Sequence, residues 1–175
     1  VARALLSSLE DENNTAVKRF LMEQLEIVGG DEAVPVLAGY LDHPQLCNRA
    51  AMALVEIGTP KAEKALGNAL ESSDKTVLLA VVNALGELHS TDYLDEIQSL
   101  AREYSGNLRK VSLRALAGSG SPEAKDVLLE AARNNNFKYA RDNAVSSLLH
   151  YAGRLGVKGN METMESLCYT IIDEC

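Results

Sequence analysis

The chain has 175 residues with a net charge of −8, 46% hydrophobic residues and only 5% aromatic residues. That length is enough for one sizeable core, and a core of Leu, Ala, Val and Ile favours helix-on-helix packing over a β-sandwich. An acidic surface repels phosphate backbones and no apolar run reaches membrane-spanning length, so we expect neither nucleic acid nor a membrane as partner.

The first stretch, residues 1–10, carries Leu5 and Leu9 at the spacing expected of the second helix of a hairpin. The first helix of that hairpin would precede Val1, and the chain does not begin with Met. We therefore expect a segment of a longer protein with flanking domains. The three cysteines form no disulfide pattern, which favours the cytoplasm; a secreted or periplasmic location stays open if a signal segment has been removed.

A helix ending of the same kind recurs along the chain, at Ala53-Leu54, Ala84-Leu85 and Ala115-Leu116. Anchor leucines follow one another at steps of 29, 31, 31 and 32 residues: Leu25, Leu54, Leu85, Leu116 and Leu148. Twelve residues after the first four anchors stand further apolar residues: Leu37, Leu66, Ile97 and Leu128. Several columns with one period predict an array of stacked helical hairpins, each too small to bury its own apolar face.

Each repeat divides into two helices, here called the A helix and the B helix. The A helices are predicted to start near Asn14, Pro44, Asp74, Asn107 and Phe137. Glycines stand where an A helix needs a left-handed closing residue: Gly29, Gly58 and Gly120. The B helices open with Thr59-Pro60 and Ser121-Pro122, where a hydroxyl caps the helix and Pro fits its first position. Asp31 and either Ser90 or Thr91 are candidate caps for the others.

The predicted repeats occupy residues 14–42, 43–73, 74–104, 105–134 and 135–175, after the lone B helix at 1–10. In the last repeat, residues 151–160 are predicted to lengthen the turn between the two helices by seven residues. An apolar helix from Met161 to Asp173 then ends the array. The predicted fold is all-α, a right-handed α-solenoid of about four and a half hairpins without strands.

Two stretches, "NLRKVSLRALAGSGSPEA" (107–124) and "CNRAAMALVEIGTPKAEKAL" (47–66), resemble HEAT repeats, especially the short bacterial type named after the phycobilisome-lyase subunits. The resemblance covers about residues 14 to 152 and implies the fold rather than an activity. The chain departs from the family pattern at Cys47 and Leu78, where a basic residue is absent, and at His89, which replaces the closing Gly.

No catalytic constellation emerges from the sequence. His43, His89 and His150 fall in separate repeats, and none has a second ligand at metal-binding spacing. Cys47 and Cys168 are interpreted as buried small hydrophobes, and Cys168 and Cys175 stand about 10 Å apart along one helix, too far for a disulfide. We therefore expect a protein that is not an enzyme and holds no metal or cofactor. The alternatives are a bilin-lyase-like subunit, implied by the resemblance, and a structural spacer within a larger enzyme.

The remaining candidate site is a surface. In HEAT arrays the B helices line the concave side, and three columns of their outward residues share one helical face. Our predicted protein-binding ridge consists of Tyr40, Lys64, Asn68, Asp95, Arg102, Asp126, Glu130 and Arg133. The final helix adds Glu165 and Tyr169 to the same face. The ridge is acidic with two arginines behind it, which predicts a protein or peptide partner of basic character.

Overall fold

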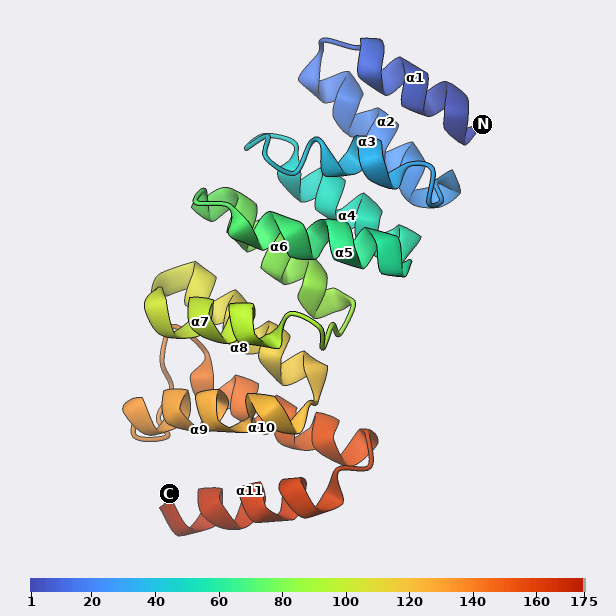
Figure 1. Ribbon diagram of the computed structural model, residues 1–175. Coiled ribbons are helices and arrows are strands. Elements are labelled where there is room, and N and C mark those ends of the chain that lie inside the picture. Colours follow the sequence, from blue (N-terminus) through green and yellow to red (C-terminus); the bar gives the residue numbers. More distant parts are fainter. Residues whose placement is uncertain (175) are drawn as a thin grey trace. The chain divides into compact units, whose positions relative to one another are not determined.

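The computed structural model describes residues 1–174, and these residues form helices, turns and no strand (Figure 1). The chain divides into two compact units, unit 1 (Val1–Leu88) and unit 2 (His89–Cys175). The boundary falls inside the predicted repeat 74–104, between its A helix and its B helix. The all-helical prediction is confirmed, and the right hand and the concave side of the array stay predictions.

Unit 1 consists of six α-helices and one short 3₁₀ segment in two layers. The A layer contains α2 (Thr15–Val28), α4 (Cys47–Ile57) and α6 (Lys75–Glu87). The B layer contains α1 (Ala2–Asp11), the five-residue α3 (Val34–Ala38), α5 (Pro60–Asn68) and η1 (Ala69–Glu71). Each helix of one layer packs against helices of the other, so every repeat shares its core with its neighbours in the unit.

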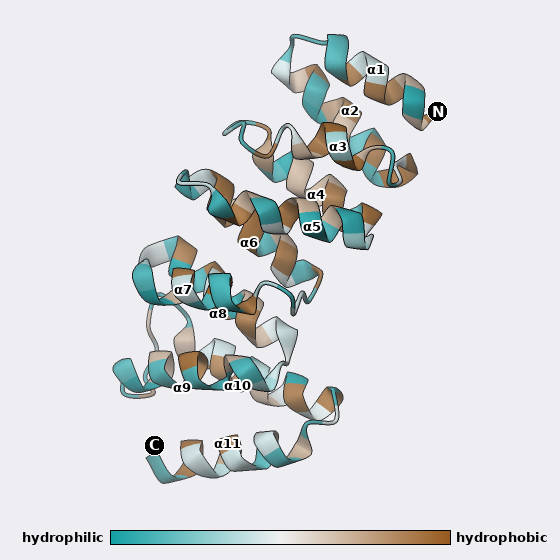
Figure 2. Cartoon of the chain, viewed as in Figure 1, coloured by the Kyte–Doolittle hydropathy of each residue, from teal (hydrophilic) through white to brown (hydrophobic). Residues whose placement is uncertain are grey.

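The core of unit 1 lies where these helices face one another. The predicted anchors Leu25, Leu54 and Leu85 are fully buried, as are Leu37 and Leu66 on the B side. Ala53 and Ala84 are buried too, and such small residues let the helix backbones approach closely. The most apolar helix, α6, buries seven residues and is among the browner ribbons in Figure 2. In α1 the buried leucines are Leu6 and Leu9, so the predicted core position Leu5 is off by one residue.

Unit 2 has the same two-layer construction. Its A layer contains α8 (Gly106–Ser119) and α10 (Ala144–Val157), and its B layer contains α7 (Leu94–Glu103), η2 (Pro122–Ala124), α9 (Lys125–Asn134) and α11 (Met161–Glu174). The anchors Leu116 and Leu148 are fully buried, and Leu128 and Ile97 are buried opposite them. The repeat register read from the sequence is therefore confirmed at every anchor of both units.

The last A helix differs from the prediction. It starts at Ala144 rather than Phe137 and runs on to Val157, so most of the predicted seven-residue extension of the turn is helical. The irregular segment lies before the helix instead, where Asn136, Phe137 and Asn143 all adopt positive φ angles. Asn tolerates the left-handed conformation better than most residues. A right-handed helix cannot continue through residues with positive φ, so this segment is not helical.

The helix ends agree with the sequence only in part. Gly58 (φ +60°) and Gly120 (φ +59°) close α4 and α8 in the left-handed conformation, whereas Gly29 (φ −76°) does not. His89 takes the left-handed position after α6 at φ +53° although it carries a side chain. Thr59 caps α5 by accepting a bond from the Ala62 amide. Ser121 precedes Pro122 at the start of η2 as predicted, but its side chain makes no capping bond. Asp31, Ser90 and Thr91 do not cap α3 and α7, whose N-cap residues are Ala33 and Tyr93.

Candidate functional site: the helix faces of each unit

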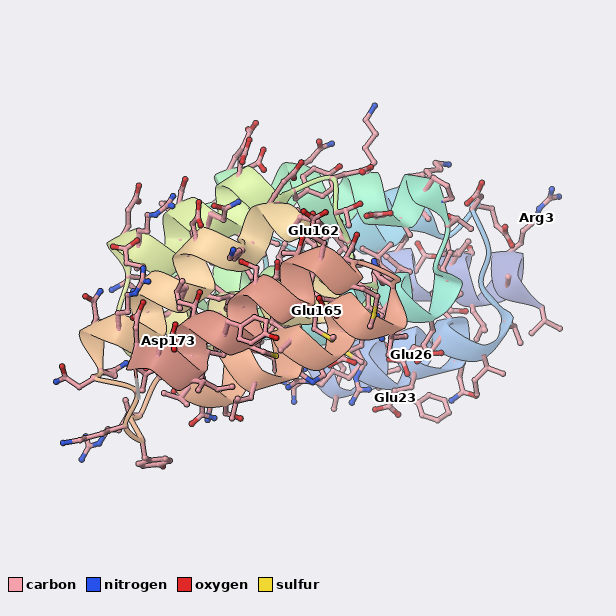
Figure 3. All side chains as sticks on the ribbon, turned by 90° about the horizontal axis from the view of Figure 1, so that it is seen from below. Arg3, Glu23, Glu26, Glu162, Glu165 and Asp173 are labelled. Atoms are coloured by element: carbon pink, nitrogen blue, oxygen red, sulfur yellow. The ribbon has the colours of Figure 1, made fainter. Side chains whose placement is uncertain are left out.

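The predicted ridge divides between the two units, which we describe separately. Five of its residues lie in unit 2, on α7 (Asp95 and Arg102) and on α9 (Asp126, Glu130 and Arg133), and all five are exposed. We call the exposed residues of α7, α9 and α11 the B-helix face of unit 2. Figure 3 labels Glu162, Glu165 and Asp173 along α11, which extend the acidic character of this face.

One arginine of this face is already paired. Arg133 donates from Nε to Glu174 Oε2 at 2.7 Å and from Nη2 to Glu174 Oε1, so the guanidinium and the carboxylate meet side by side. The hydrogen bonds with Glu174 raise the pKa of Arg133, and those with Arg133 lower the pKa of Glu174. Lys125 Nζ also reaches Ser166 Oγ at 3.3 Å. These contacts tie α9 to α11, and Arg133 is engaged before any partner arrives.

In unit 1 the predicted ridge residues have different surroundings. Lys64 and Asn68 are exposed on α5, and Asn68 lines a hollow of about 410 Å³ beside Asp42 and Glu71. Tyr40 is half-buried, and its hydroxyl accepts a bond from Lys18 Nζ at 2.9 Å and donates to the Leu9 carbonyl at 3.1 Å. Tyr40 therefore joins α1 and α2 to the end of the α3 segment, and only part of its side chain is accessible to a partner.

Charge in unit 2 is separated by helix layer. The three B helices carry nine acidic and three basic side chains. The two A helices carry four basic side chains, Arg109, Lys110, Arg114 and Arg154, and no acidic one. Each layer in unit 2 therefore presents a surface of one dominant sign, which the net charge of the whole chain conceals.

Several structural residues escaped the sequence reasoning. The buried Tyr151 donates to the Ser121 carbonyl at 2.8 Å, and burial raises its pKa to about 12, with a smaller contribution from Asp126. Arg154 and Asn160 donate to the carbonyls of Gly118 and Gly120 at 3.1 and 3.3 Å. These donors satisfy carbonyls at the end of α8, which have no partner within the helix.

A second unpredicted contact is the ion pair between Arg109 and Asp142, with Nε and Oδ2 3.0 Å apart. Both side chains are mostly buried, and Arg109 also donates to the Ala101 carbonyl. Asp142 in turn accepts from the Ala144 amide at 3.2 Å, at the start of α10. Arg109 on α8 thus links α7 to the turn before α10.

No catalytic arrangement is evident in the described part of the chain. Within residues 1–174 no three His, Cys, Asp or Glu side chains lie close enough together to hold a metal ion. Cys47 is buried as predicted, and burial raises the pKa of its thiol, which disfavours the reactive thiolate. Cys168 is only half-buried, and Cys175 lies outside the described residues, so its lack of a disulfide with Cys168 stays a prediction.

Comparisons with known proteins agree with the hairpin architecture. The family model for HEAT repeats matches residues 44–101 and 63–149, which together span more than half of the chain. A solved structure, the crystal structure of an engineered protein from the Northeast Structural Genomics Consortium, is similar with a TM-score of 0.55. It is 19% identical, and the match covers 95% of this chain and 88% of that chain, which shows the fold alone.

A search of curated proteins gave no match. Among residues 1–174, no helix combines the length and the apolar character needed to cross a bilayer.

Proposed function

The chain belongs to the HEAT-repeat family, and on this premise we propose that it is a non-catalytic scaffold that binds a protein or peptide through the B-helix face of unit 2. HEAT repeats generally mediate interactions between proteins. The choice of this face as the binding surface rests on its charge: its helices carry nine acidic and three basic side chains. An exposed surface of one sign attracts a partner of the opposite sign, so the proposed partner is basic.

The proposed contacts are spread over the face. Asp95, Asp126 and Glu130 steer the partner, and Arg102 at the end of α7 helps to fix its register. Each exposed ion pair contributes only about 0–1 kcal/mol, so affinity depends on several weak contacts rather than on one residue. Because Arg133 is paired with Glu174, its role is to hold α11 in place, and the face stays predominantly negative.

A charge reversal on this face tests the proposal. The partner is isolated with the wild-type chain, and its association rate is then measured with the double variant Asp95→Lys, Asp126→Lys. We expect slower association at low salt and a much smaller difference at high salt, because ions screen the attraction. The matched control reverses two exposed acids in unit 1, Glu32→Lys with Glu56→Lys, and leaves the rate nearly unchanged. An unchanged rate for Asp95→Lys, Asp126→Lys at low salt would refute the proposal.

The alternatives make different predictions. A structural spacer needs no partner on this face, so a failure of both variants to alter any interaction would favour that role. The resemblance to the short bacterial repeats stays part of our proposal, but no observation favours a bilin-lyase-like activity.

A further inference from the structure

We propose that a second copy of this chain stacks on the first head to tail, with an apolar face on α10 of one copy against an apolar face on α2 of the next. The α2 face consists of Val17, Phe20, Gln24 and Ile27, and the α10 face consists of Ser146, Leu149, Gly153 and Val157. Each set follows helical spacing, so its members lie along one side of their helix. Neither face is part of the B-helix face, so the proposal does not depend on the function proposed above.

Exposed large hydrophobic side chains are concentrated near the two ends of the sequence. Of the eleven in the part of the chain that the structure describes, five lie in residues 1–28 and five in residues 149–172. None of the eleven lies between residues 29 and 138. Clustered apolar side chains of this kind are typical of a surface that another molecule covers.

Inside unit 1, an ion pair shows which positions meet when one A helix stacks on the next. Arg49 of α4 reaches Glu26 of α2, with Nη1 and Oε1 3.2 Å apart. Counted from the anchor leucine of its own helix, Arg49 occupies position −5 and Glu26 occupies position +1. The same two positions lie close together in unit 2, where Asn143 and Ala117 line one hollow between α10 and α8. Position −5 of an A helix therefore faces position +1 of the A helix before it.

The α2 face and the α10 face carry apolar side chains at these two positions. Phe20 occupies position −5 on α2 and Leu149 occupies position +1 on α10, and each is 57% exposed. A second copy whose α2 follows α10, as α4 follows α2 in unit 1, brings Phe20 against Leu149. The contact repeats the stacking inside the unit, with an apolar pair in place of the ion pair. This correspondence favours a second copy of the chain over an unrelated partner.

The other residues of the two faces suit close packing. Neither face contains a charged side chain, so no ion has to lose its water when the faces meet. A Cβ added at Gly153 would meet no atom within 4 Å, so the α10 face has room between Leu149 and Val157. A large side chain of the second copy, such as Phe20 or Ile27, can occupy this space. Burial of these side chains supplies the driving force for association.

The first test is the mass of the wild-type chain in solution. Because the two faces differ, each copy uses its α10 face for one neighbour and its α2 face for another, and association continues past a dimer unless a ring closes. Sedimentation velocity should therefore show a mass that rises above that of the monomer with increasing concentration. A monomer at every concentration would overturn the proposal and leave a flanking segment of a longer chain as the better candidate to cover both faces.

Two single variants separate a head-to-tail contact from a symmetric one. Phe20→Asp blocks the α2 face and Leu149→Asp blocks the α10 face, and each should weaken self-association roughly tenfold or more, because a carboxylate is buried without a partner. An equal mixture of the two variants should form a dimer with one copy of each, since each variant keeps one intact face. If only one of the two variants lost self-association, the contact would be symmetric and the proposal wrong.

A charge exchange tests the pairing of Phe20 with Leu149. Phe20→Arg alone should weaken association, and the double variant Phe20→Arg, Leu149→Glu should recover about two- to fivefold of the loss, because it recreates the ion pair between Arg49 and Glu26. Added salt should reduce this recovery. No recovery at low salt would overturn the register on which the proposal rests.

The matched control is Tyr139→Asp, which changes an exposed aromatic residue of unit 2 outside both faces and should associate like the wild type. An equal loss in this control would overturn the proposal. Circular dichroism checks that each variant folds, and Ile27→Asp or Val157→Asp replaces a variant that does not. The B-face variant Asp95→Lys, Asp126→Lys should still self-associate, so failure of the proposed function and failure of this proposal are distinguishable.

Discussion

Units 1 and 2 share one architecture but distribute their charged residues differently. In unit 1 the A helices α2, α4 and α6 carry four basic and four acidic residues, and the B helices carry three of each. Its surplus of acid lies in the connections, for example at Glu12, Asp31 and Asp42. In unit 2 the surplus lies on the B helices, while the A helices are purely basic.

The difference shows in how the arginines of the A layers are used. In unit 1, Arg49 bridges Glu23 and Glu26 at 3.0 and 3.2 Å, so opposite charges neutralise each other within the layer. In unit 2, Arg109 is mostly buried against Asp142 in the turn before α10, and Lys110 and Arg114 line a hollow between α8 and α10. The same fold thus provides a neutral A layer in one unit and a charged one in the other, because charged residues at exposed helix positions contribute little to stability and vary without changing the fold.

The largest expected effect tests whether the two cores are equivalent. Leu85→Ala in unit 1 and Leu116→Ala in unit 2 each remove a fully buried side chain, and each should lower the free energy of unfolding by about 2–5 kcal/mol. Chemical denaturation followed by circular dichroism measures this loss. An unchanged denaturant midpoint for either variant would contradict the repeat register.

The loss of an arginine contact should destabilise unit 2 more than unit 1. Arg109→Met should destabilise the protein by roughly 1.5–3 kcal/mol, because it removes charge-assisted hydrogen bonds that are mostly buried. Arg49→Met breaks ion pairs whose side chains are more exposed, and it should cost about 0–1 kcal/mol. Equal losses in the two variants, measured by urea denaturation, would show that burial does not distinguish these contacts.

The buried Tyr151 of unit 2 should make the stability of the protein depend on alkaline pH. Since burial raises the pKa of Tyr151 to about 12 from an ordinary value of 10, the neutral phenol is favoured in the folded state. Its contribution is fully present below pH 10 and is lost as the pH rises from 10 toward 12. Tyr151→Phe should cost about 1 kcal/mol at neutral pH, through the lost bond to Ser121, and should make this alkaline decline shallower. Tyr40→Phe in unit 1, where the tyrosine is half-buried, is the matched control.

The smallest expected effect concerns the side-chain caps of the A helices, which α2 and α6 of unit 1 have and α8 of unit 2 lacks. Hydrogen bonds from the Thr76 and Val77 amides lower the pKa of Asp74 from its ordinary value of 3.8. The stabilisation by ionised Asp74 is present above pH 3.8 and is lost as the pH falls through the lower folded-state pKa. Asp74→Asn keeps a capping oxygen, so stability at neutral pH should change little and its acid dependence should weaken.

The control for the cap is Asn14→Asp at the start of α2, which should add an acid dependence of the same sign. Thermal melts at a series of acidic pH values measure both variants. An identical acid profile for Asp74→Asn and the wild type would mean that Asp74 is not the titrating cap.

The sequence by itself determined the helical class, the repeat period and the core positions. Each hairpin buries its apolar face only by stacking on its neighbours, so Leu54, Leu85 and Leu116 recur at fixed spacing and remain visible without a structure. Helix ends that depend on a single residue were also predicted correctly, namely the left-handed Gly58 and Gly120 and the Thr59 cap. Two predictions from local sequence were wrong. Gly29 does not adopt the left-handed φ expected of a closing glycine, and Phe137 does not start the last A helix. A residue type typical of a helix end or start does not determine φ by itself, because the conformation of the adjacent residues also matters.

Tertiary structure decided which polar residues are available for binding. Tyr40 and Arg133 occupy predicted surface positions, yet each is engaged by a residue more than 20 positions away in sequence, Lys18 and Glu174. A hollow between α8 and α10 likewise combines residues from 110–117 with residues from 143–150. The absence of acidic residues in these two helices was a signal in the sequence, but only their packing shows that they form one surface. Helical periodicity specifies which face of each helix is buried, whereas the side chains that meet across two helices depend on their packing.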